Sequence, residues 1–122
     1  MNSKTRIGAV SYLNTRPLVF GLEQGVGEER IHLSYAVPSV LADQMIGGEL
    51  DIALMPVIEL ARNPELEIVP GLAIGTSGPS RSVLLISRRP IEKVESIALD
   101  PESRTSNALV QVLCRQVWEI EP

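Results

Sequence analysis

The sequence contains few of the residues that most often carry catalysis or metal binding. Cys114 is its single cysteine and His32 its single histidine. One cysteine excludes an internal disulfide and a Cys-rich zinc site. One histidine leaves a His-rich metal site without support and a Ser-His-Asp triad with little. We therefore expect no bound metal. Aromatic residues make up 3% of the chain, so a folded core has to consist of Ile, Leu, Val and Ala.

Positive charge and long apolar runs are also scarce. The formal net charge is −4 and no run of Lys and Arg stands out, which argues against a nucleic-acid groove or an anionic membrane surface. No stretch approaches the roughly 20 apolar residues that cross a bilayer. No apolar run of signal-peptide length follows the positive start at residues 1–6. These absences, together with the lone thiol, predict a cytoplasmic protein with no nucleic-acid or membrane partner.

The residues that are present alternate between strand and helix patterns. With 122 residues, of which 44% are hydrophobic, the chain is long enough to bury a core. The patterns predict strands at 6–11, 31–37, 51–55, 68–75, 81–88 and 96–100, and helical segments at 15–24, 38–46, 56–61 and 107–118. Alternation of this kind, with nearly continuous apolar strands, predicts an α/β fold with a parallel or mixed sheet covered by helices.

A charged, Pro-containing stretch divides the chain. We predict a first α/β lobe at 1–88, a hinge connector at 89–95 and the start of a second lobe at 96–122. One strand and one helix cannot bury their own apolar faces, so the last part needs a partner. That partner is either the first sheet or sequence outside these 122 residues.

Polar side chains collect at the predicted helix starts, where a small anionic ligand could bind. Free N–H groups and partial positive charge suit such a site to a carboxylate or phosphate, and in parallel sheets the ligand crevice lies beyond the carboxyl ends of the strands. For any single loop, N-capping is the simpler explanation. The residues are Ser11, Asn14, Thr15, Ser39, Ser77, Ser80, Ser82, Ser103, Thr105 and Ser106.

Charged residues near these loops have two interpretations each. Arg16, Arg81 and Arg104 could each grip a carboxylate with two hydrogen bonds, or each could be a solvated arginine or a surface ion pair. Asp51 is better explained as a turn-stabilising carboxylate than as a general base. Glu59 has a similarly simple explanation, either as a surface residue or as an acidic residue in the first turn of a helix.

Other motifs give no support to a bound nucleotide. The Gly-rich stretch 75–80 lacks the Gly-Lys-Ser/Thr ending of a phosphate-binding loop, and GxGxxG does not occur. His32 is expected at the end of its strand opposite the crevice, and Cys114 is expected to be a small buried hydrophobe. We expect no cofactor.

Five ordered motifs resemble one known family. They are VSYLNTRPL at 10–18, GELDIALMP at 48–56, PGLAIG at 70–75, GPSRSVLL at 78–85 and SRTS at 103–106. This series resembles the MqnA family, the chorismate dehydratases of the futalosine route to menaquinone. The similarity extends from about Ile7 to the last helix and so covers nearly the whole chain.

The resemblance implies a fold, a reaction and a set of site residues. The fold is the periplasmic-binding-protein-like type II fold, here one near-complete lobe with a mixed sheet plus the first βα unit of a second lobe. The reaction is a cofactor-free dehydration of chorismate to 3-[(1-carboxyvinyl)oxy]benzoate, a lyase reaction. The resemblance places Asn14 and Ser82 at the reacting substrate, with Ser80 two positions away on the same loop. Expected substrate-binding residues are Ser11, Thr15, Arg16, Ser80, Ser103, Arg104, Thr105 and Ser106.

Length separates this chain from the family it resembles. Members of that family are longer and contain the rest of the second lobe, so we expect the chain to be a fragment with about half of the active site. A solute-binding protein for a small organic anion is the alternative function. A truncated or split product without independent function is a third. An uncovered second-lobe face favours pairing with a second copy or with a separate chain that carries the missing lobe.

Overall fold

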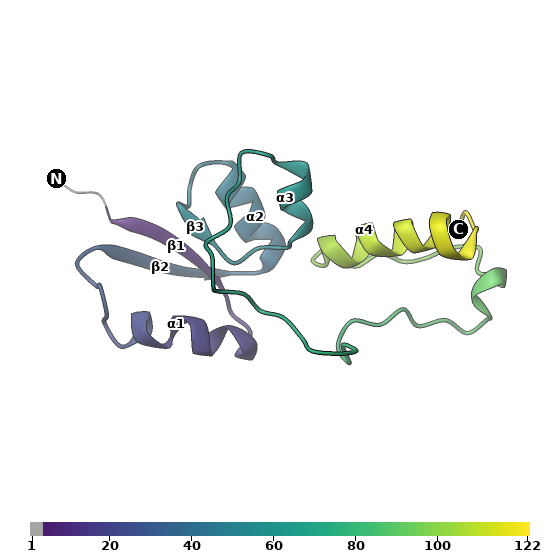
Figure 1. The fold of residues 1–122 in the computed structure, drawn as a ribbon, viewed down its shortest axis with the longest axis horizontal. Helices are drawn as coiled ribbons and strands as arrows, with labels where there is room; N and C mark the ends of the chain where they lie inside the picture. The colour runs from purple at the N-terminus through teal and green to yellow at the C-terminus, as the bar shows by residue number, and fades with distance from the viewer. Residues whose placement is uncertain (1–3) are drawn as a thin grey trace. The chain divides into compact units, whose positions relative to one another are not determined.

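The computed structural model describes residues 4–122, which form two compact units (Figure 1). The first unit ends at Ile74 and the second spans Gly75–Pro122. Each unit is described separately below. The lobe boundaries expected from the sequence, 1–88, 89–95 and 96–122, belong to a two-lobed protein and stay a prediction.

The first unit contains a small parallel sheet. Its strands are β1 (Thr5–Val10), β2 (Ile31–Ala36) and β3 (Ile52–Ala53), in the order β2-β1-β3. Strand β1 pairs with β2 from Thr5↔Ile31 to Val10↔Ala36, and with β3 at Ile7↔Ile52 and Gly8↔Ala53. The α/β class is confirmed. The expected mixed sheet is wrong for the described chain, because all three strands run in the same direction.

Helices connect these strands and cover both faces of the sheet. A short 3₁₀ turn, η1 (Leu13–Thr15), leads into α1 (Arg16–Glu23), and α2 (Pro38–Ile46) and α3 (Ile58–Arg62) follow β2 and β3. Figure 1 shows α1 on one side of the sheet and α2 and α3 on the other. Pro lies in the first turn of both α1 and α2, where its missing N–H costs no hydrogen bond. These positions agree with the helix starts expected from the sequence.

The core is aliphatic, as the scarcity of aromatic residues predicts. Val10, Leu41 and Leu50 form a buried cluster. Gly8 lies against this cluster so closely that a Cβ atom there would be 2.5 Å from Leu50 Cδ1 and 2.6 Å from Leu41 Cδ2. The absence of a side chain at position 8 therefore allows Leu41 of α2 and Leu50, which precedes β3, to pack directly on the central strand β1.

A charged pair joins β1 to Asp51, the residue before β3, at the amino edge of the sheet. Asp51 Oδ2 accepts hydrogen bonds from the Arg6 backbone N–H at 2.8 Å and from Arg6 Nε at 3.1 Å, while Oδ1 accepts from Nη2 at 2.7 Å. The Arg6 hydrogen bonds hold the pKa of the Asp51 carboxyl at about 2, below its ordinary 3.8. The structure thus confirms a structural role for Asp51.

The second unit contains one substantial helix. Helix α4 (Arg104–Leu113) continues into a π-helical turn, η3 (Cys114–Trp118), and a short 3₁₀ turn, η2 (Ile91–Lys93), precedes both. The helix begins three residues before the expected Asn107, because the Asn107 N–H already donates to the Ser103 carbonyl at 3.0 Å. Cys114 is buried, which confirms its expected role as a small hydrophobe.

Three expected strands are wrong. Within residues 4–122, the segments 68–75, 81–88 and 96–100 belong to no sheet; residues 70–71 form a turn, residues 81–83 are bent, and most side chains of the three segments are exposed. A strand requires a hydrogen-bonded neighbour as well as an apolar sequence, and the described chain supplies none to these segments.

Candidate functional site

The carboxyl edge of the sheet is formed by the loops that follow each strand. Because the three strands are parallel, Val10, Ala36 and Ala53 all lead to the same edge. The loop after β1 has the most polar side chains of the three, and it enters α1 directly. His32 lies in the first part of β2, away from this edge, as expected.

The loop after β1 combines exposed polar groups with one buried hydroxyl. Ser11 and Asn14 are exposed, whereas Thr15 is 1% exposed. The Thr15 backbone N–H donates to the Tyr12 carbonyl at 3.0 Å, which closes the η1 turn. The Thr15 Oγ1 atom has no hydrogen-bond partner among the described residues. A buried hydroxyl without a partner costs stability, so its retention at the start of α1 is unusual.

N-capping does not explain the polar residues at these helix starts. Thr15, Val37 and Ser103 are the N-cap residues of α1, α2 and α4, and in the described part of the chain none makes a side-chain capping hydrogen bond. Ser39 lies inside the first turn of α2 rather than before it. The simpler explanation offered by the sequence is therefore not the one that the structure adopts.

Arg16 is engaged by an acidic side chain two turns along its own helix. Its Nη1 atom is 2.7 Å from Glu23 Oε1, and Tyr35 Oη donates to the same oxygen at 2.6 Å. The hydrogen bond to Glu23 raises the pKa of Tyr35. This network ties α1 to β2. Arg16 thus adopts the ion-pair alternative in this structure, and its contact with substrate stays a prediction.

The two serines near position 81 lie together. Ser80 Oγ and Ser82 Oγ are 3.3 Å apart, and the Ser82 backbone N–H lies 3.4 Å from Ser80 Oγ. Both side chains are exposed, as is that of Arg81 between them. Either hydroxyl can reach a ligand at this loop, so the geometry gives no preference between Ser80 and Ser82.

A second hydroxyl cluster lies at the start of α4. Ser103 Oγ donates to Ser106 Oγ at 2.9 Å. The turn before it is held by Asp100, whose carbonyl accepts from Asn107 Nδ2 at 2.7 Å and whose Oδ1 accepts from the Glu102 N–H at 3.0 Å. Arg104, Thr105 and Ser106 are half-buried in the first turn. The helix start therefore carries an ordered set of hydroxyl groups.

The predicted site residues fall into three separate groups. Ser11, Asn14, Thr15 and Arg16 belong to the first unit, whereas Ser80 and Ser82 form a pair in the second unit, and Ser103–Ser106 form another cluster there. Within its own group, each set is brought together. The two expected catalytic residues, Asn14 and Ser82, belong to different units.

For Glu59 the sequence predicted a surface or first-turn helical position; the structure confirms the first turn but buries the side chain. Glu59, in α3 after the carboxyl end of β3, is 3% exposed. Its Oε1 is 3.2 Å from Arg62 Nη1, and its Oε2 accepts from Asn63 Nδ2 at 3.2 Å. The available signal was an arginine three residues later on the same helix and an asparagine four residues later, directly after the helix end. Glu59 is thus an acidic group near the edge where the sequence offered no obvious one.

Among residues 4–122, no three His, Cys, Asp or Glu side chains are grouped so that they could hold a metal ion. None of the helices in that range has both the length and the apolar character needed to span a bilayer.

Fold and site together define a class of protein. It is an α/β protein whose parallel sheet leads into a polar loop and helix start at its carboxyl edge, an arrangement suited to a small anionic molecule. Residues 5–122 match the model of a protein family described as menaquinone biosynthesis. The chain therefore belongs to this family and has a role in menaquinone biosynthesis, which confirms at the family level the resemblance found in its motifs.

Proposed function

We propose that this chain is part of a chorismate dehydratase, an enzyme that converts chorismate to 3-[(1-carboxyvinyl)oxy]benzoate and water. Family membership over residues 5–122 is the observation that carries the proposal. Support also comes from the helix starts of α1 and α4, where hydroxyl groups are not used for capping. A dianionic substrate needs two such places, one for each carboxylate.

The reaction is chemically simple for a protein of this kind. A ring C–H bond breaks, its electron pair completes the aromatic ring, and the C–O bond to the ring hydroxyl breaks to release water. Aromatisation supplies the driving force, so the proposal includes no metal and no redox cofactor. The protein has to hold the dianion, orient it and assist the leaving hydroxyl.

We assign roles to individual residues as part of this proposal. Asn14 and Ser82 orient the reacting ring and hydrogen-bond to the departing hydroxyl. A substrate carboxylate receives the ring proton. Ser103–Ser106 hold a carboxylate at the start of α4, and Ser11, Thr15, Arg16 and Ser80 complete the binding set. A cytoplasmic location belongs to the same proposal.

The test is to mix the purified protein with chorismate and to follow its ultraviolet spectrum and the mass of the product. Loss of the diene absorption with formation of the dehydrated product supports the proposal. Binding with an unchanged spectrum instead indicates the solute-binding alternative. If the 122-residue chain alone is inactive, the assay is repeated on the chain extended by a second-lobe polypeptide. Absence of both binding and conversion in the extended protein would contradict the proposal.

Variants then test the residue assignment. Asn14→Ala and Ser82→Ala are expected to lower turnover by about 100-fold or more, the usual effect of removing a hydrogen-bond donor to developing charge. Ser96→Ala, at an exposed serine of the second unit outside both hydroxyl clusters, is the matched control and is expected to keep full activity. A Ser80→Ala variant decides between the two adjacent serines. Unchanged turnover in Asn14→Ala and Ser82→Ala would contradict the assignment of these two residues to the reacting substrate.

A further inference from the structure

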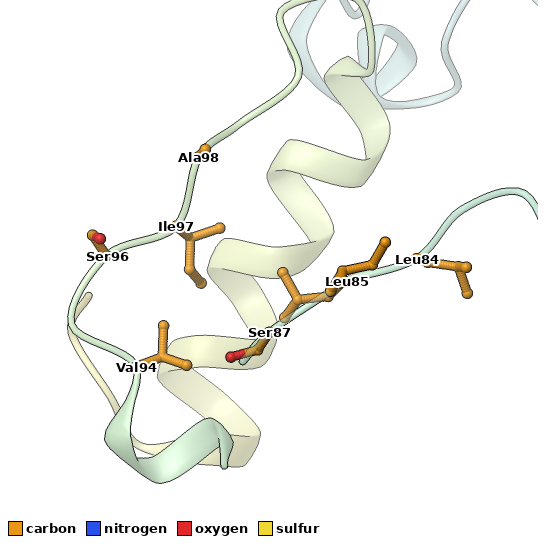
Figure 2. Close-up of a pocket in the computed structure, with 8 residues that line it drawn as sticks. Leu84, Leu85, Ser87, Val94, Ser96, Ile97 and Ala98 are labelled. Atoms are coloured by element: carbon orange, nitrogen blue, oxygen red, sulfur yellow. The ribbon is translucent and has the colours of Figure 1, made fainter. Parts of the chain in front are cut away.

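An anionic ligand needs a cationic partner, and the lining of the pocket in the second unit supplies none. This pocket, of about 300 Å³, is lined by apolar side chains together with Ser87 and Ser96 (Figure 2). No residue that the structure places in its lining carries a charge. In the first unit, by contrast, Arg16 lies at the start of α1, directly after the polar loop that follows β1. Arg16 is therefore well placed to bind a carboxylate at that loop.

The two charges of α1 lie at the ends of the helix where its dipole disfavours them. Arg16 is the first residue of the helix and Glu23 is the last. A helix carries partial positive charge at its N-terminus and partial negative charge at its C-terminus, so it favours the opposite placement. These charges therefore do not stabilise the helix through its dipole. A ligand carboxylate at the start of α1 would interact favourably with the dipole and with Arg16.

The contact that holds Arg16 in this structure can be exchanged for a stronger one. Its Nη1 atom is 2.7 Å from Glu23 Oε1, and within residues 4–122 the guanidinium makes no other hydrogen bond. The Arg16 side chain is 64% exposed, so water screens this ion pair. A ligand carboxylate that accepts two parallel N–H groups of the guanidinium makes a stronger and better oriented contact.

Glu23 keeps a partner when Arg16 leaves. The Tyr35 hydroxyl donates to the same Oε1 atom at 2.6 Å, and the Glu23 side chain is 23% exposed, so that water also reaches it. Release of Arg16 therefore does not leave a buried carboxylate unpaired, which would be costly. Because Tyr35 belongs to β2, its hydroxyl also holds Glu23 against the sheet. Glu23 can thus stay in place while Arg16 moves.

The direction of helical side chains indicates where a released Arg16 would go. Side chains of an α-helix tilt toward its N-terminus, so Glu23 leans toward Arg16, and a released Arg16 leans toward the loop after β1. That loop holds exposed Ser11 and Asn14, and Thr15, whose buried hydroxyl has no partner in the described part of the chain. A rotation of one side chain thus brings the guanidinium to the polar groups that the proposed function assigns to substrate.

We propose that Glu23 is a positioning residue, which holds Arg16 when no ligand is bound and releases it to a carboxylate group of the substrate. Tyr35 keeps Glu23 in place during this exchange. The inference rests on the proposed function, because the substrate carboxylate is the second partner of Arg16. Since Glu23 and the ligand compete for one guanidinium, Glu23 lowers the affinity for the ligand.

NMR titration of the purified protein tests the exchange, with benzoate as a carboxylate that cannot react and chorismate as the proposed substrate. Glu23→Gln removes the competing charge and is expected to bind both about two- to fivefold more tightly. Arg16→Ala is expected to bind them about tenfold more weakly or worse. In Arg16→Ala/Glu23→Gln the second change should bring no gain, because no arginine is left to release. Glu29→Gln, at a glutamate beside another arginine of the first unit, is the matched control and should leave both affinities unchanged.

The ionisation of Tyr35 gives a second readout, which a merely structural role of Glu23 would not move. The hydrogen bond to Glu23 raises the pKa of Tyr35, and the charge of Arg16 partly offsets this rise. Saturation with benzoate is therefore expected to shift one tyrosine ionisation to higher pH in the wild type and to leave it unchanged in Arg16→Ala. The wild-type titration needs no substitution, so it decides the question even if a variant folds poorly.

The outcomes separate this inference from the proposed function. Equal affinities of wild type and Glu23→Gln, or the same gain from Glu23→Gln with and without Arg16, would overturn the exchange. So would an unshifted Tyr35 ionisation, or a failure of both benzoate and chorismate to bind. Conversion of chorismate that responds to neither substitution would leave the proposed function standing and remove the exchange. The expected responses to benzoate without conversion of chorismate would support the exchange and contradict the dehydratase.

Discussion

Adding one methyl group at Gly8 should measurably destabilise the first unit. The Cβ of a Gly8→Ala variant would lie 2.5 Å from Leu50 Cδ1 and 2.6 Å from Leu41 Cδ2, well inside van der Waals contact. Leu41 is fully buried and Leu50 nearly so, hence neither side chain can move into solvent without leaving the core. Overpacking of this kind costs about 1–3 kcal/mol in the free energy of unfolding.

Urea unfolding followed by circular dichroism measures this cost. With m-values of about 1–3 kcal/mol/M, the midpoint of Gly8→Ala should fall by about 1 M urea. Gly75→Ala is the matched control: a Cβ there meets nothing within 4 Å and its φ is not positive, so the same change should be neutral or slightly stabilising.

A double-mutant cycle identifies the cause of the loss. Leu50→Ala removes both methyl groups that the new Cβ would meet at this residue. The double variant should therefore be less destabilised than the sum of the single variants, with a coupling of at least about 0.5 kcal/mol. Strict additivity, or a Gly8→Ala midpoint equal to that of the wild type, would refute the close-packing argument.

Three further predictions follow from single contacts. Arg6 holds the pKa of Asp51 at about 2 rather than 3.8. The ionised Asp51 therefore stabilises the fold fully above pH 3.8, and this stabilisation is lost as the pH falls toward 2. Asp51→Asn should flatten the decline in stability to urea between pH 3.8 and 2, and an unchanged decline would contradict this role of the ion pair. Thr15→Val removes a buried hydroxyl without a described partner, so thermal unfolding should show equal or higher stability, and a lower melting temperature would reveal a hidden hydrogen bond. The Glu23 hydrogen bond raises the pKa of Tyr35, so Glu23→Gln should shift one tyrosine ionisation to lower pH in a spectrophotometric titration, and Tyr35→Phe should abolish that ionisation.

The part of the fold that depends on local pattern was predictable. Strands β1 and β2 and helices α1 and α2 lie close to their expected positions, because apolar periodicity, first-turn prolines and the Gly47–Gly48 stop are local signals. Gly48 has a φ of 72° at the end of α2, a conformation that glycine adopts without strain.

The part that depends on distant partners was not predictable. The segments 68–75 and 81–88 have the composition of buried strands, yet pairing also requires a neighbour, and no local pattern reports whether a neighbour is present. The same reasoning applies to β3, which pairs over two residues where five were expected. An apolar pattern shows that a segment can be buried, but the order and pairing of the strands decide whether it is.

Site prediction shows the same division. The hydroxyl groups at helix starts were visible in the sequence, and so was a structural role for Asp51. The burial of Glu59 and the Arg16–Glu23–Tyr35 network were not visible, since both depend on how a side chain turns back over its own helix or onto a neighbouring strand. Candidate residues can be found from the sequence, but the hydrogen-bond and ion-pair partners of each one become known only from the structure.

The central position of β1 affects the order in which the first unit can form. During synthesis β1 emerges before both of its neighbours, so its two edges stay open until β2 and then β3 have left the ribosome. The last clamp, Arg6 to Asp51, joins residues 45 positions apart. Closing contacts of such long range slows folding. The sheet of a nascent chain cannot be completed until β3 has been translated, whereas a sheet built from hairpins can pair each strand with the one just before it.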